Sequence, residues 1–154
     1  MDKEVFANKV LENEQSLYRV SMSMLRSEAD AQDAVYDTIL TAYEKINTLR
    51  NDDSFSSWLM QILVRYCYKT LKGRKRFEDS GEDLADETSR DNPYINVEIG
   101  EAISSLSPKI RAVVLLYYVE DYSLKEIHSV LNIPVGTVKS RLNKGRNQIK
   151  SFLE

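Results

Sequence analysis

The sequence has little of the chemistry that cross-links a chain or carries it across a membrane. A single cysteine, Cys67, excludes an intramolecular disulfide and favours a reducing, intracellular setting. The longest apolar run, Val113 to Val119, is too short to cross a bilayer, and the first ten residues have no apolar signal-peptide core. We therefore expect a soluble, cytoplasmic protein.

Groups for catalysis or metal binding are also scarce. The one histidine, His128, stands inside a predicted helix, where packing or solvation is a more common role than metal ligation. No Cys/His cluster has the spacing of a zinc site, and no glycine-rich loop could hold a phosphate. The sequence therefore predicts neither an enzyme nor a cofactor or small-molecule substrate.

Five glycines and three prolines among 154 residues leave room for long helices. Apolar residues recur at spacings of three and four, so the predicted fold class is all-α. Helices are expected near 3–25, 28–47, 54–72, 94–106, from Pro108, at 124–131 and from Pro134. Their inward positions are predicted to be Phe6, Val10, Leu17, Ser21, Met24 and Leu25; Ala31, Ala34, Val35, Thr38, Ile39, Ala42 and Ile46; Phe55, Leu59, Ile62, Leu63 and Tyr66; Ile110, Val113, Val114, Tyr117 and Tyr118; and Val138, Leu142 and Ile149.

The net charge of −3 is distributed unevenly, with +1 over residues 1–77, −7 over 78–98 and +3 over 99–154. The stretch from Glu78 to Pro93 has almost no apolar residues and cannot order itself by burial. We expect an acidic linker at 78–93 between two small helical domains, 1–77 and 94–154. Both flanking parts are neutral or basic, so the overall charge does not exclude nucleic-acid binding.

The segment from Ser123 onward has the pattern of a helix-turn-helix. Ser123 and Glu126 are spaced as a capping box, and Asn132 tolerates the left-handed conformation that ends a short helix. Pro134 then opens a second helix, with Ile133 as the apolar residue of the turn.

In this motif the start of the second helix enters the DNA major groove, where Lys, Arg and Asn read base edges. The open alternative is an amphipathic surface helix with solvated charges. The candidate DNA-binding residues are Gly136, Thr137, Lys139, Ser140, Arg141, Asn143, Lys144 and Arg146.

The outward face of the predicted helix at 28–47 mixes carboxylates with large apolar groups. Asp33, Tyr36, Asp37, Leu40 and Glu44 follow at helical spacings. Apolar anchors with a charged rim are typical of a protein–protein contact. The alternative is an ordinary charged helix surface.

The next helix has a basic outer face with interleaved tyrosine, which suits phosphates and unstacked bases. Trp58 belongs either to the core or to the edge of this face. The remaining candidates are Gln61, Arg65, Tyr68, Lys69, Lys72, Arg74, Lys75 and Arg76.

These segments together resemble the extracytoplasmic-function (ECF) sigma factors of bacterial RNA polymerase, in the sigma-70 family. DAQDAVYDTILTAYEKI resembles region 2.2, SFSSWLMQILVRYCYKTLKGRKR resembles regions 2.3 and 2.4, and AISSLSPKIRAVVLLYYVEDYSLKEIHSVLNIPVGTVKSRLNKGR resembles region 4. Tyr36 stands where many members have Gln, and Arg65 stands where many have Asn.

The resemblance implies that the first domain is region 2, a bundle of three or four helices, and the second is region 4, with four. Asp33, Tyr36, Asp37 and Leu40 would contact the β′ clamp helices of core polymerase. Arg65, Lys69 and residues 72–76 would engage the −10 element, and Lys139 to Lys144 the −35 element. The β flap and an anti-sigma factor would be further partners, and the linker would lie near the RNA path or act as a simple tether.

Two other functions fit the same pattern. A self-sufficient helix-turn-helix regulator would bind an operator without polymerase, usually as a dimer on paired half-sites. A helical interaction or adaptor protein would give no promoter-specific transcription.

Overall fold

The computed structural model describes residues 1–81 and 96–154, which divide into two compact units, Met1–Arg90 and Asp91–Glu154. Within those two described ranges every regular element is helical. The prediction of an all-α chain with two small helical domains is therefore confirmed. The greater part of the expected linker, residues 82–93, lies outside the described residues.

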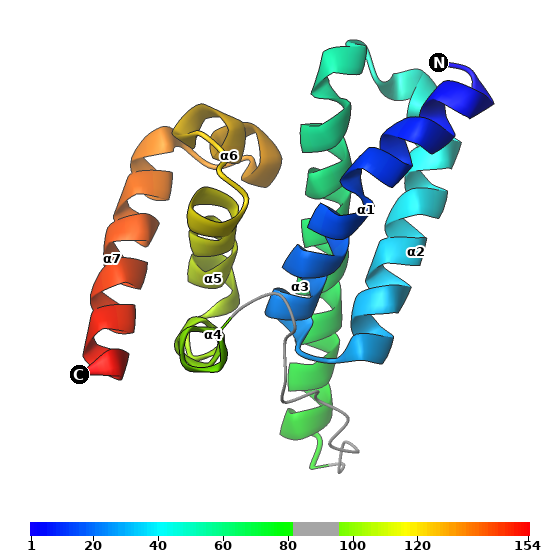
Figure 1. Cartoon of the computed structure of the whole chain (residues 1–154). Helices are drawn as coiled ribbons and strands as arrows, with labels where there is room; N and C mark the ends of the chain where they lie inside the picture. The colour runs from blue at the N-terminus through cyan, green and yellow to red at the C-terminus, as the bar shows by residue number, and fades with distance from the viewer. Residues whose placement is uncertain (82–95) are drawn as a thin grey trace. The chain divides into compact units, whose positions relative to one another are not determined.

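The first unit consists of three long helices that pack against one another (Figure 1): α1 (Lys3–Leu25), α2 (Glu28–Lys45) and α3 (Phe55–Asp79). Two 3₁₀ turns, η1 (Ile46–Thr48) and η2 (Asp52–Ser54), join α2 to α3. Between α1 and α2, Arg26 takes a left-handed conformation with φ 51°, and Ser27 caps α2 by accepting a hydrogen bond from the Asp30 amide. Predicted inward residues from all three helices are buried, among them Phe6, Val10, Leu17, Leu25, Val35, Thr38, Phe55, Leu59 and Leu63.

The helix α3 extends to Asp79, seven residues beyond its predicted end at Lys72. Gly73 was not enough to end the helix, because the Lys and Arg residues that follow it are good helix formers. Glu78 and Asp79, which were expected to open the linker, form the last turn of α3 instead. The basic segment from Lys72 to Arg76 is therefore presented on a helix rather than on a loop.

The second unit contains α4 (Val97–Ser104), α5 (Pro108–Val114), η3 (Leu115–Val119), α6 (Leu124–Leu131) and α7 (Val135–Leu153). Its core forms where α5 and α7 meet, with Val113, Leu116 and Val138 buried. The buried Arg111 donates to the backbone carbonyls of Ser104 and Leu106 at 3.1 and 2.9 Å. This side chain therefore stabilises the turn between α4 and α5.

Tyr117 and Tyr118 are exposed, contrary to the prediction that they face inward. The reason is that Leu115–Val119 forms a π turn, in which the Glu120 amide donates to the Leu115 carbonyl five residues earlier. This wider turn rotates the following side chains away from the position that an α-helical repeat gives them. Leu115 and Leu116 fill the core instead.

Gly145 is a buried position in α7 that the sequence analysis did not single out. A Cβ placed there would lie 2.6 Å from Val114 Cγ2 and 3.1 Å from Ile110 Cγ2. The missing side chain therefore allows α7 to pack closely against α5. Ile149, which was predicted to face inward, is only half-buried one turn later.

Candidate protein and nucleic-acid interfaces

The predicted contact face of α2 is exposed as one continuous stripe. Asp33, Tyr36, Asp37 and Leu40 all point away from the core, and Tyr36 and Leu40 are 56% and 63% exposed. We call these four residues the α2 stripe. Large apolar groups exposed beside carboxylates are unusual on a solvated helix and suit a surface that another protein covers.

The basic face of α3 is exposed along most of its length. Arg65, Lys69, Lys72, Lys75 and Arg76 are solvent-accessible, while Gln61 and Tyr68 are half-buried at its border. The exposed cations extend over more than two turns of α3, so the face can follow a phosphate backbone.

A hollow of about 190 Å³ lies between α2 and α3. Its lining residues are Thr41, Lys45, Ile62, Arg65, Tyr66 and Lys69. The Thr41 and Tyr66 hydroxyls are hydrogen-bonded at 2.6 Å, which explains why the predicted core residue Tyr66 is only half-buried. The cationic side chains of Lys45, Arg65 and Lys69 line this hollow and can donate hydrogen bonds to a bound group.

Sequence reasoning identified Arg65 and Lys69 but missed the α2 side of this hollow. Thr41 and Lys45 stand four residues apart on α2 and so project side by side. That spacing was visible in the sequence, but the adjacency of α2 to α3 at this point was not.

Trp58 lies at the edge of the core rather than inside it. Its side chain is half-buried, and its ring centroid is 6.0 Å from that of the buried Phe55. The accessible part of the indole is available for stacking, so Trp58 stays a candidate for the edge of the basic face.

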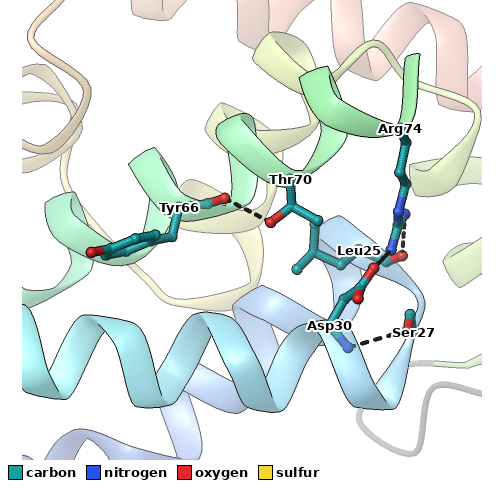
Figure 2. Close-up of polar contacts among 6 residues, drawn as sticks. All are labelled: Leu25, Ser27, Asp30, Tyr66, Thr70 and Arg74. Carbon is teal, nitrogen blue, oxygen red and sulfur yellow. Dashed lines mark hydrogen bonds and ion pairs between the residues drawn. The ribbon is translucent and has the colours of Figure 1, made fainter. Parts of the chain in front are cut away.

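Arg74, a predicted DNA-binding residue, makes two contacts within the first unit (Figure 2). Its guanidinium donates to the Leu25 carbonyl at 2.8 Å and forms an ion pair with Asp30. A guanidinium with two protein partners is poorly placed to grip a phosphate. Arg74 is half-buried and bonded within the first unit, whereas Arg65, Lys69, Lys72, Lys75 and Arg76 are exposed.

The helix-turn-helix has the local geometry that its sequence predicts. The Glu126 amide donates to the Ser123 hydroxyl and the Ser123 amide donates to the Glu126 carboxylate, each at 3.0 Å. Asn132 takes the left-handed conformation with φ 54°. His128 reaches across the turn, with Nδ1 2.6 Å from the Ile133 carbonyl, so this ring nitrogen is the donor. The capping box thus fixes the start of α6, while Asn132 and the His128 hydrogen bond fix the turn that follows it.

Tyr122 precedes the capping box and is shielded from water. Burial, assisted by the nearby Glu120 and Glu126 carboxylates, raises the pKa of the Tyr122 hydroxyl to about 12. This hydroxyl therefore stays protonated throughout the physiological range.

The recognition helix α7 leaves its first turn open. Pro134 occupies the N-cap position and no side chain caps the helix, so its first amides are available to a phosphate. A Cβ at Gly136 would meet nothing within 4 Å, which leaves this backbone accessible. Lys139, Ser140, Asn143, Lys144 and Arg146 are exposed, whereas Thr137 and Arg141 are half-buried.

Residues 1–81 and 96–154 contain no group of three or more His, Cys, Asp or Glu side chains that could hold a metal ion. In the same ranges no helix has the length and apolar character needed to span a bilayer.

Comparison with known proteins gives matches over both units. Residues 10–77 match the family Sigma-70 region 2, and residues 96–149 match Sigma-70, region 4. The chain is 30% identical over 156 residues to the ECF RNA polymerase sigma factor SigM of Mycobacterium tuberculosis, covering 99% of this chain and 79% of the relative. It is 28% identical over 169 residues to the ECF RNA polymerase sigma factor SigW of Bacillus subtilis (strain 168), covering 99% and 90%. The sigma factor RpoE, solved in complex with the anti-sigma factor NepR from Bartonella quintana, has the same fold, with a TM-score of 0.81, 22% identity and 97% coverage of each chain.

Proposed function

The chain belongs to the sigma-70 family, among its ECF RNA polymerase sigma factors, and we propose that its two units divide promoter recognition between them. As an alternative sigma factor it binds bacterial core RNA polymerase and directs promoter-specific initiation. The observation that carries the division of labour is the separation of surfaces: one unit has an acidic, apolar stripe beside a basic face, and the other has a helix-turn-helix.

The α2 stripe is the proposed contact with the β′ clamp helices of core polymerase. Tyr36 and Leu40 would supply apolar anchors, and Asp33 and Asp37 the charged rim. Tyr36 in place of the usual Gln makes the contact more apolar in this chain than in many members of the family. The β flap would be a second contact on polymerase.

The basic face of α3 is the proposed −10 interface. Its exposed cations would neutralise phosphates of the melted strand, while Trp58 and Tyr68 offer rings for stacking. The hollow beside Arg65 and Lys69 would receive an unstacked base. Because cations surround it, this hollow favours a base edge that is rich in acceptors.

The first three turns of α7 are the proposed −35 interface. Lys139, Asn143 and Lys144 would reach base edges in the major groove, and the open amides at the start of α7 would hold a phosphate. Polymerase would set the distance between the two elements, so free protein should bind promoter DNA weakly.

The remaining assignments follow from membership of this family. Polymerase would perform the chemistry, and this chain would act in the cytoplasm as a dissociable specificity subunit without catalysis of its own. An anti-sigma factor would hold it inactive, as the neighbouring solved structure is a complex of that kind. The acidic linker would lie near the RNA path or act as a simple tether.

Reconstituted transcription tests the proposal. Purified chain and core polymerase are given promoter DNA, and the charge-reversed variant Asp33→Arg/Asp37→Arg is compared with the parent. We expect the affinity for core polymerase to weaken by about tenfold or more. The variant loses the ion pairs that the two carboxylates would form, and its new arginines would repel the cations of the partner that formed them. Helicity should be unchanged because both positions are exposed.

The matched control is Glu12→Arg/Glu14→Arg, which makes the same charge change at two exposed positions on α1. This control should bind core polymerase like the parent. Equal binding by both double variants would refute the α2 assignment. Tight operator binding by the free chain, with no gain of promoter selectivity by polymerase, would favour a self-sufficient regulator instead.

A further inference from the structure

The last turns of α3 carry the basic cluster but bury almost nothing. The buried residues of α3 end at Cys67, and every side chain from Lys75 to Asp79 is exposed. Gly73 lies within this part of the helix, and no atom lies within 4 Å of the position that a Cβ would occupy there. A glycine-containing helix end without buried apolar side chains is weak on its own and needs another attachment.

Arg74 provides that attachment, as Figure 2 shows. Its two terminal nitrogens reach the Leu25 carbonyl at the end of α1 and the Asp30 carboxylate in the first turn of α2. The Leu25 carbonyl belongs to the last turn of α1, where carbonyls have no partner within the helix. One half-buried guanidinium thus connects the ends of all three helices.

The two partners are held in place for reasons of their own. Ser27 caps α2 by accepting from the Asp30 amide, which fixes Asp30 at the helix start. A carboxylate is favoured at a helix N-terminus, as Asp30 is in α2. A cation is favoured at a helix C-terminus, as the Arg74 guanidinium is beside the end of α1. The planar fork of arginine presents two donors in a fixed geometry, which the single ammonium nitrogen of lysine does not reproduce, so lysine is a poor substitute.

The direction of Arg74 decides where its neighbours point. Lys72 and Arg76 are four residues apart and therefore share one face of α3. Each is two residues from Arg74, which places them about 160° around the helix from it. While Arg74 is bonded inward, Lys72 and Arg76 must face solvent, and both are exposed.

We infer that Arg74 is a positioning residue: it does not touch DNA, but it anchors the end of α3 so that Lys72 and Arg76 face the −10 strand. This inference rests on the proposed −10 role of α3. The anchor also lies at the start of the helix that carries the α2 stripe, so it adds a contact between the proposed polymerase-binding and DNA-binding helices.

The test uses the full chain, alone and with core polymerase on promoter DNA. The variants are Arg74→Ala, Arg74→Lys, Asp30→Asn and the double variant Asp30→Asn/Arg74→Ala, with Arg76→Ala as the matched direct-contact control. In the free chain, amide hydrogen exchange over residues 73–79 should be roughly three- to tenfold faster in every anchor variant and unchanged in Arg76→Ala. A residue that only contacts DNA would not change this exchange.

On promoter DNA, Arg74→Lys should weaken the open complex about as much as Arg74→Ala, although it keeps the charge. The double variant should be no worse than Arg74→Ala, because Asp30→Asn weakens only the ion pair that Arg74→Ala has already removed. Core affinity is measured in parallel, since Asp30 lies near the α2 stripe.

The outcomes separate the two hypotheses. The inference is overturned if Arg74→Lys binds promoter like the parent, or if Asp30→Asn leaves exchange over 73–79 unchanged. If instead the anchor variants alter exchange while Lys72→Ala and Arg76→Ala leave promoter opening intact, the −10 assignment of α3 fails and Arg74 is merely structural.

Discussion

The two units of this chain encode their surfaces in different ways. In the first, α2 and α3 each bury one face and present the proposed contacts on exposed faces, so the repeat of the helix assigns most roles. In the second, short helices depend on caps, a left-handed turn, a π turn and a buried glycine. The comparison indicates that the first unit is sensitive to the loss of core volume, and the second to single changes at the points where its helices begin, end or cross.

The largest expected effect is in the core of the first unit. Leu63 is fully buried, so Leu63→Ala should lower the free energy of unfolding of that unit by about 2–5 kcal/mol. Fluorescence of Trp58, the only tryptophan, reports urea unfolding of this unit. Amide exchange in α5 and α7 should stay at the parent level; a matching loss there would mean that the units do not unfold independently.

Next in size is a steric change in the second unit. Gly145→Ala should destabilise it by about 1–3 kcal/mol, because the new methyl group overlaps the side chain of Val114. Gly136→Ala makes the same substitution in open space on the same helix and should be neutral or stabilising. Thermal unfolding followed by circular dichroism compares the pair, and equal melting temperatures would show that close packing at Gly145 is unimportant.

Helix caps come third. Ser123→Ala removes the capping box of α6 and should cost about 1 kcal/mol of stability in the second unit. Ser107→Ala is the matched control, because Ser107 is an N-cap residue whose side chain makes no capping hydrogen bond. Chemical denaturation should rank Ser107→Ala above Ser123→Ala in stability; the reverse order would contradict the cap assignment.

The last effect is confined to high pH and is absent under physiological conditions. The folded state raises the pKa of Tyr122 from 10.0 to about 12, so the folded chain retains a proton that the unfolded chain loses. The stabilisation is therefore complete below pH 10 and is lost as pH rises from 10 toward 12. Tyr122→Phe should flatten this decline in unfolding midpoints measured between pH 9 and pH 12, whereas parallel curves for the two proteins would count against a shifted Tyr122.

Local sequence was enough to predict the parts that depend on neighbours along the chain. The α2 stripe follows from helical spacing, and the capping box and Asn132 follow from residue chemistry at helix ends. Both the long helices and the helix-turn-helix could therefore be derived before any coordinates were known.

Features that depend on contacts between helices could not be predicted in this way. The repeat from Ile110 to Tyr118 fits an α-helix well, and only tertiary packing selects the π turn that exposes Tyr117. In the run GRKR the sequence gives each basic residue the same predicted role. Arg74 differs only because the fold brings Asp30 within ion-pair distance of it. The hollow between α2 and α3 likewise needs both helices in place.

The turns of this fold also leave room for it to become more robust. Arg26, Asp121 and Asn132 all have positive φ angles, of 51°, 59° and 54°, in conformations that glycine adopts without strain. Natural proteins rarely reach their highest possible stability, and replacing a residue that has a positive φ angle by glycine can raise the free energy of unfolding. Glycine substitutions at Arg26, Asp121 and Asn132 could therefore raise the thermal stability of the protein. None of these three residues belongs to a surface proposed to contact polymerase or DNA.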